Sequence, residues 1–162
     1  MSFRCVDCLI RFKFRCILIL GMPKMELNSV ETTYLQEMYR AHEGKTTITT
    51  GYFAKKFMVK PASAFDVIER LAKKKLVERT GWGKFRLTSR GLMVAARIIH
   101  NHRVLETYFS TNLGLSPSDA CLQASRIDYA IGDLVVRKMC MRLNYPSVCI
   151  HGNEVRHQKC AD

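Results

Sequence analysis

Apolar residues first recur with helical spacing from Val30 onward. Val30, Tyr34 and Met38 stand four residues apart and predict one apolar face of a helix that ends near His42. The polar residues 43–45 then interrupt the pattern. We therefore expect a first regular helix over about 30–42.

Two further helices are predicted before the first glycine-rich turn. The hydroxyl-rich stretch 46–50 is expected to be a linker, and one of its threonines can cap a short helix over 51–57. Pro61 suits the first turn of a third helix, where a missing N–H does no harm. Apolar residues of that helix recur at helical spacing: Ala64, Val67, Ile68 and Leu71.

A β-hairpin is predicted next. The segments 76–80 and 84–88 flank Gly81-Trp82-Gly83, and two glycines around one aromatic residue permit a tight reversal. Helix, short helix, turn, helix and hairpin in this order are typical of a winged helix-turn-helix, whose third helix enters the major groove of DNA. The alternative is a basic α+β domain of another kind.

The rest of the chain is predicted to be helical. A long helix, capped by Thr88 or Ser89, is expected to reach about Leu113, and a second one starts at Ser116-Pro117 and runs to about 131. A further helix over about 133–143 precedes an irregular tail. The fold class is thus mostly α with a small β wing: an extension (1–24), a winged helix-turn-helix domain (25–90) and a helical dimerisation and metal-binding domain (91–162).

The net charge of +12 points to a polyanionic partner. Residues 45–90 hold twelve Lys and Arg against three acidic residues, so most of the excess lies in the predicted DNA-binding domain. We expect base contacts from the start of the third helix and phosphate contacts from the lysines and arginines around it. Trp82 can insert beside a sugar or pack under the wing. The predicted DNA-binding residues are Lys55, Lys56, Lys60, Ala62, Ser63, Phe65, Asp66, Arg79, Trp82, Lys84 and Arg86.

Seven scattered cysteines argue against a disulfide framework, and in a cytoplasmic protein they are free thiols or metal ligands. No apolar run reaches the roughly 20 residues of a membrane helix. The short apolar stretch 16–22 follows basic residues as in a secretory signal, but no small-residue cleavage site precedes Pro23. We interpret 1–24 as a poorly ordered extension, with Met22 or Met25 as alternative starts.

A metal-binding set is predicted on the two helices that follow the wing. His102 and Glu106 are four residues apart, and Cys121 lies on the next helix. A short connection predicts that these helices pack antiparallel, so that imidazole, carboxylate and thiolate converge in a way that suits zinc. Cys149 and His151 of the tail are further candidates. The alternatives are a surface His–Glu ion pair and a core cysteine.

These residues resemble the diphtheria toxin repressor and manganese-transport repressor family, especially its short archaeal members. The resemblance covers about 30–155 and is carried by the segments 34–39, 61–78, 87–91, 102–106 and 149–152. It implies a homodimeric, metal-responsive regulator that binds a palindromic operator. The SH3-like domain of longer members is expected to be missing.

The resemblance also implies where metal binds. His102, Glu106 and Cys121 match one site of the family. The family's second site falls on Thr33, Gln36, Ser125, Asp128 and Tyr129, of which only Asp128 is a good ligand, so we expect that site to be lost. We expect one transition-metal ion per subunit, zinc being favoured over iron or manganese, bound by His102, Glu106, Cys121 and Cys149, with Asp128 and His151 nearby.

The sequence thus predicts a cytoplasmic DNA-binding regulator, a repressor by resemblance, with double-stranded DNA and a second copy of the chain as partners. No membrane partner and no small organic substrate are expected. An enzyme such as a zinc hydrolase is disfavoured because no general base accompanies the metal-binding residues. The alternative is a metal-independent or architectural DNA-binding protein of the same fold.

Overall fold

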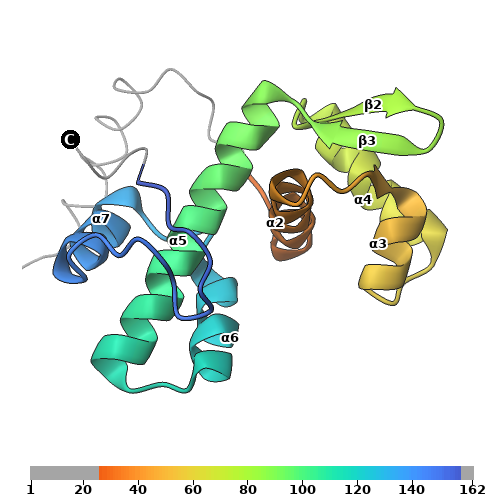
Figure 1. The fold of residues 1–162 in the computed structure, drawn as a ribbon. Coiled ribbons are helices and arrows are strands. Elements are labelled where there is room, and N and C mark those ends of the chain that lie inside the picture. The colour runs from red at the N-terminus through yellow and green to blue at the C-terminus, as the bar shows by residue number, and fades with distance from the viewer. Residues whose placement is uncertain (1–25, 158–162) are drawn as a thin grey trace, which may run out of the picture.

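The computed structural model describes residues 26–157, in which a long central helix connects two groups of smaller elements (Figure 1). The N-terminal group contains α2 (Ser29–Glu43), β1 (Ile48–Thr49), α3 (Thr50–Lys56), α4 (Pro61–Lys73), β2 (Val77–Gly81) and β3 (Lys84–Leu87). The long helix is α5 (Ser89–Leu113), and the C-terminal group contains α6 (Pro117–Ile127) and α7 (Asp133–Arg142). The predicted extension 1–24 lies outside the described residues.

The N-terminal group is a winged helix, as predicted. Its three strands have the order β1-β3-β2, and both pairings are antiparallel. The segment 46–50 was expected to be a linker only. It contains β1, because Ile48 is buried and pairs with Phe85 of the wing. A strand of two residues is too short to show a period in the sequence.

The helix starts and ends follow local signals in the sequence. Asn28 caps α2 and forms a capping box with Glu31, and Thr49 caps α3. Ser116 caps α6, with Pro117 directly after it. Gly114 ends α5 in the left-handed conformation, at φ 70°, which a glycine adopts without strain.

One hydrophobic core holds the winged helix together. The rings of Tyr34, Phe53 and Phe57 stack, with Tyr34 and Phe53 centroids 4.5 Å apart. Leu35 and Ile68 are fully buried beside them. Each fully buried side chain of this size contributes about 1.5–3 kcal/mol, so the core suffices to order the short α3.

Helix α5 is joined to the winged helix by a close backbone contact. Gly91 lies so near the strand entry that an added Cβ would come within 1.9 Å of the Leu76 carbonyl oxygen. The amide of Thr88 donates to the same oxygen, at 3.0 Å. The start of α5 is thus fixed against the winged helix.

The C-terminal segment folds back over α5 and α7. Ser147 accepts a hydrogen bond from the amide of Val155, and Val148 forms a bridge with Glu154. Helix α6 ends at Ile127, earlier than the predicted 131, and a turn follows. A second small core forms here from Val104, Val136, Cys140, Cys149 and Val155.

Candidate metal centre and DNA-binding surface

The metal-binding side chains predicted on α5 and α6 lie together. His102 and Glu106 are one helical turn apart and buried, and His102 Nε2 lies 3.2 Å from Glu106 Oε2. Cys121 of the antiparallel α6 brings its Sγ to 3.5 Å from the same Nε2. Imidazole, carboxylate and thiol therefore face one point between the two helices.

The C-terminal segment adds two more candidate ligands near Glu106. His151 Nδ1 lies 3.2 Å from Glu106 Oε2, and Cys149 is buried beside them. The ligand atoms form two groups that share Glu106: one with His102 and Cys121, the other with Cys149 and His151. Cys149, predicted as a fourth ligand, is thus not in one group with His102 and Cys121. His151, predicted only to lie nearby, is in close contact with the Glu106 carboxylate.

Asp128 lies behind the centre and orients His102. Its Oδ2 is 3.0 Å from His102 Nδ1 and accepts a hydrogen bond of 2.6 Å from Gln36 Nε2. Asn101 Nδ2 donates to the Asp128 backbone oxygen. A carboxylate on one ring nitrogen is how proteins fix a metal-binding histidine with its other nitrogen toward the ion. Asp128 is therefore placed as a partner of a ligand.

Charge within the centre is strongly coupled. Burial by itself lowers the pKa of His102, but contacts with Asp128 and Glu106 outweigh burial and raise the pKa to about 10. Burial by itself raises the pKa of Glu106, yet contacts with His102 and Cys149 outweigh it and lower the pKa to about 2. Burial and then Glu106 raise the pKa of the Cys149 thiol. Without metal the centre thus holds an imidazolium–carboxylate pair, and a metal ion must displace protons to bind.

The geometry fits a transition-metal ion. Glu106 Oε2 is buried and lies 3.2 Å from two imidazole nitrogens, yet among the described residues it has no hydrogen-bonding partner. Around a tetrahedral zinc ion, nitrogen and oxygen ligands are roughly 3.3 Å apart, and nitrogen and sulfur roughly 3.6 Å. The observed 3.2 Å and 3.5 Å match these separations.

Five positions correspond to the second metal site of the family, which was expected to be lost. Their side chains do not form a comparable set of metal ligands. Gln36 and Asp128 hydrogen bond to each other. Thr33 Oγ1 and Ser125 Oγ donate to backbone oxygens of their own helices, those of Ser29 and Leu122 respectively. Among residues 26–157, no metal-binding group includes any of the five positions.

The predicted base-contacting residues lie on the exposed side of α4. Lys60, Ala62, Ser63 and Asp66 are exposed, whereas Phe65 is half-buried. No side chain caps the start of α4. The amides of its first turn are therefore positioned for a phosphate group, as at other helix N-termini.

The wing presents a cationic edge with an aromatic tip. Trp82 is 97% exposed, which excludes packing under the wing. Arg79 lies over the rings of Phe65 and Phe85, at 6.0 and 5.7 Å from their centroids. Arg86 pairs with Glu78, and Lys56 pairs with Glu37 of α2. Lys55 and Lys84 are exposed.

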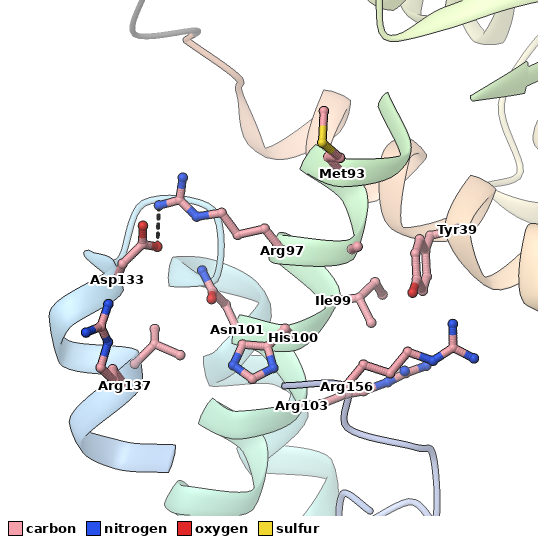
Figure 2. A pocket seen from close by; sticks show the side chains of 12 residues that line it. Tyr39, Met93, Arg97, Ile99, His100, Asn101, Arg103, Asp133, Arg137 and Arg156 are labelled. Carbon is pink, nitrogen blue, oxygen red and sulfur yellow. Dashed lines mark ion pairs between the residues drawn. The ribbon is translucent and has the colours of Figure 1, made fainter. Parts of the chain in front are cut away.

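A cavity of about 220 Å³ opens between α2, α5 and α7 (Figure 2). Arginines from α5, α7 and the C-terminal segment line it, and several are paired: Arg97 with Asp133 at 2.6 Å, and Arg103 with Glu43 at 3.0 Å. The sequence did not predict this cavity because its lining residues come from segments without a common period. The ion pairs tie α5 to α2 and to α7.

Comparison with known proteins finds part of this chain similar to a domain of iron-dependent repressors. Residues 88–156 match the model of the iron dependent repressor, metal binding and dimerisation domain. Over 107 residues the chain is 23% identical to an uncharacterised helix-turn-helix transcriptional regulator of Methanocaldococcus jannaschii, covering 65% of this chain and 86% of the relative.

Solved structures share the fold. A hypothetical protein of Sulfolobus solfataricus is 28% identical, with a TM-score of 0.64, over 80% of this chain and 99% of its own. A manganese regulator, SloR, is 24% identical, with a TM-score of 0.72, over 82% of this chain. The chain spans 61% of the length of that regulator.

Proposed function

From the premise that this chain is a relative of the iron-dependent repressors, matched over residues 88–156, we propose that it is a metal-binding transcriptional regulator. It binds operator DNA as a homodimer through α4 and the wing. One zinc-class ion per subunit is held by His102, Glu106 and Cys121, and Cys149 and His151, which also lie near Glu106, are candidates for the remaining position. The protein acts in the cytoplasm and has no catalytic role. Among the described residues, no helix has the length and apolar content of a membrane span.

The observation that carries this proposal is the connection between the metal centre and the DNA-binding domain. His102 contacts Asp128, and Asp128 accepts a hydrogen bond from Gln36 of α2. The neighbouring Arg103 pairs with Glu43 of the same helix. A displacement of His102 is thus transmitted through these contacts to α2. Helix α2 packs on α4, the helix proposed to contact DNA bases.

The ion would supply a cross-link between α5, α6 and the C-terminal segment. This chain's residues do the rest. Asp128 holds the His102 ring in one orientation, and the burial of Glu106 keeps water from competing for its oxygens. His102 and Glu106 would hold the ion once the imidazolium of His102 had lost its proton. The bound ligands would stiffen the C-terminal half of α5.

Relatives support a transition metal. The matched domain is described as metal-binding, and one structural neighbour is a manganese regulator. The ligands here include two thiols, and soft sulfur ligands favour zinc over manganese. Zinc is therefore the first ion to test, with iron and manganese as competitors.

The test compares DNA binding with and without metal. A DNA sequence is selected from a random library with zinc-loaded protein, and affinity is measured at fixed salt for zinc-loaded and chelated protein. We expect a palindromic site and a 5–150-fold difference in Kd between the two states. His102→Gln should abolish the difference, whereas the exposed His42→Gln, outside the centre, should retain it. Selective binding without a metal effect would support a metal-independent regulator, and uniform affinity for all sequences an architectural protein.

A further inference from the structure

A second set of metal-binding side chains lies on α5, α7 and the C-terminal segment. His100, Cys140 and His157 place one imidazole nitrogen or thiol sulfur each within 4.8 Å of one another. His100 precedes His102 by two residues, so it projects roughly 200° around α5 from it. The two sets are therefore separate and lie on different faces of the helix.

The orientation of His157 is that of a metal ligand. Its Nε2 lies 3.0 Å from the carbonyl oxygen of Pro146, which can only accept, so Nε2 carries the proton. Nδ1 then presents its lone pair to Cys140 Sγ, at 3.3 Å. A backbone carbonyl on the outer nitrogen of an imidazole is a common feature of metal-binding histidines.

His100 completes the set from α5. Its side chain is half-buried. It also hydrogen bonds to the backbone of Arg156. Its ring lies edge-on to that of His157, with centroids 5.5 Å apart. Both rings are thus anchored on backbone groups of the C-terminal segment.

We propose that His100, Cys140 and His157 bind a second transition-metal ion of the zinc class. Two imidazoles and one thiolate suit zinc, and the fourth position is left for water or another donor. Arg97 and Arg137 lie near His100 in the cavity (Figure 2). In such basic surroundings the negative charge of a thiolate compensates part of the charge of the ion.

The role of this ion is structural and concerns the first centre. The segment 147–155, which carries Cys149 and His151, is flanked in the sequence by Cys140 and His157. Cys140 and Cys149 belong to the same small core. An ion that links His157 to α5 and α7 therefore restrains the C-terminal end of this segment. Cys149 and His151 of the segment lie near Glu106. This site does not depend on DNA binding or on the proposed regulatory function.

The test counts metal ions in the full chain. Protein is saturated with zinc, dialysed and analysed by mass spectrometry for zinc per chain. We expect two ions in the native chain and in His42→Gln, one in His157→Gln, one in His102→Gln, and none in the double variant of His157 and His102. With cobalt, His102→Gln should keep a thiolate-to-metal absorption band that the further change Cys140→Ser removes.

Two results would overturn the proposal. One is a single zinc ion in the native chain that His157→Gln leaves in place, and the other is two ions in both proteins. His157 is half-buried near the end of the described chain, so its variant is expected to fold. Circular dichroism checks this, and His100→Gln provides a second variant with the same expected loss of one ion.

Discussion

Gly91→Ala tests the junction between the winged helix and α5, the helix that carries the candidate metal ligands His102 and Glu106. An alanine Cβ would lie 1.9 Å from the Leu76 carbonyl oxygen and 2.8 Å from its carbon. Ordinary contact begins near 3.4 Å, so α5 and the strand entry must separate by about 1.5 Å. No flexible side chain can absorb this shift, because both partners are backbone.

The cost follows from the contacts at this point. Overpacking in a buried site costs about 1–3 kcal/mol. The separation also strains two hydrogen bonds of Thr88, from its amide to Leu76 at 3.0 Å and from its Oγ1 to Lys75 at 2.8 Å, each worth about 1 kcal/mol. We expect a loss of about 3–5 kcal/mol in the free energy of unfolding, a large part of the 5–15 kcal/mol typical of a domain.

The assay is urea unfolding of the full chain followed by circular dichroism. Gly51→Ala is the matched control, because a Cβ there meets only Thr49 Oγ1 at 3.9 Å. Gly51 lies in α3, where alanine is favoured over glycine, so the control should gain a few tenths to about 1 kcal/mol. A Gly91→Ala protein within 1 kcal/mol of the native chain would refute the close packing of α5 on the winged helix.

Three further predictions concern the wing, the metal-free centre and its connection to α2. Lys84→Ala should weaken binding to all DNA sequences and reduce the salt dependence of log Kd by about one unit, in anisotropy titrations; a change in sequence preference alone would contradict this. In chelated protein the raised pKa of His102 stabilises the fold fully below about pH 6.5, and this stability is lost as pH rises toward 10, by about 1 kcal/mol per unit. His102→Gln should flatten that part of the pH profile of unfolding, and an unchanged slope would contradict the assigned ion pair. Gln36→Leu should retain zinc but bring the metal-dependent ratio of DNA affinities toward one; an unaltered ratio would exclude the Asp128–Gln36 route.

Much of the fold could be predicted because local signals agree with tertiary packing. The spacing of Tyr34 and Met38 predicted α2 and both are buried, whereas Val30, predicted on the same face, is 49% exposed at the start of the helix. Pro61 and Gly114 marked a helix start and a helix end that the structure also has. The winged-helix order was confirmed by the structure and by its neighbours. The two-residue β1 was missed, because its pairing with β3 is a long-range contact.

The candidate metal centre was predictable only in part. His102 and Glu106 show the spacing of one helix face, and Cys121 could be added because a short connection forces α5 and α6 to pack. The positions of Cys149 and His151 depend on the course of an irregular segment. The spacing of apolar residues does not predict that course. His100, Cys140 and His157 come from three elements with no common spacing, so only the three-dimensional arrangement brings them together.

The central claim is that a transition-metal ion binds between α5, α6 and the C-terminal segment of a DNA-binding regulator. Its most direct test is a crystal structure of the zinc-loaded protein with anomalous data at the zinc absorption edge. We expect an anomalous peak within bonding distance of His102 Nε2, Glu106 and Cys121 Sγ, with Asp128 on the far nitrogen of His102. A zinc-loaded crystal without a peak between these side chains would contradict it.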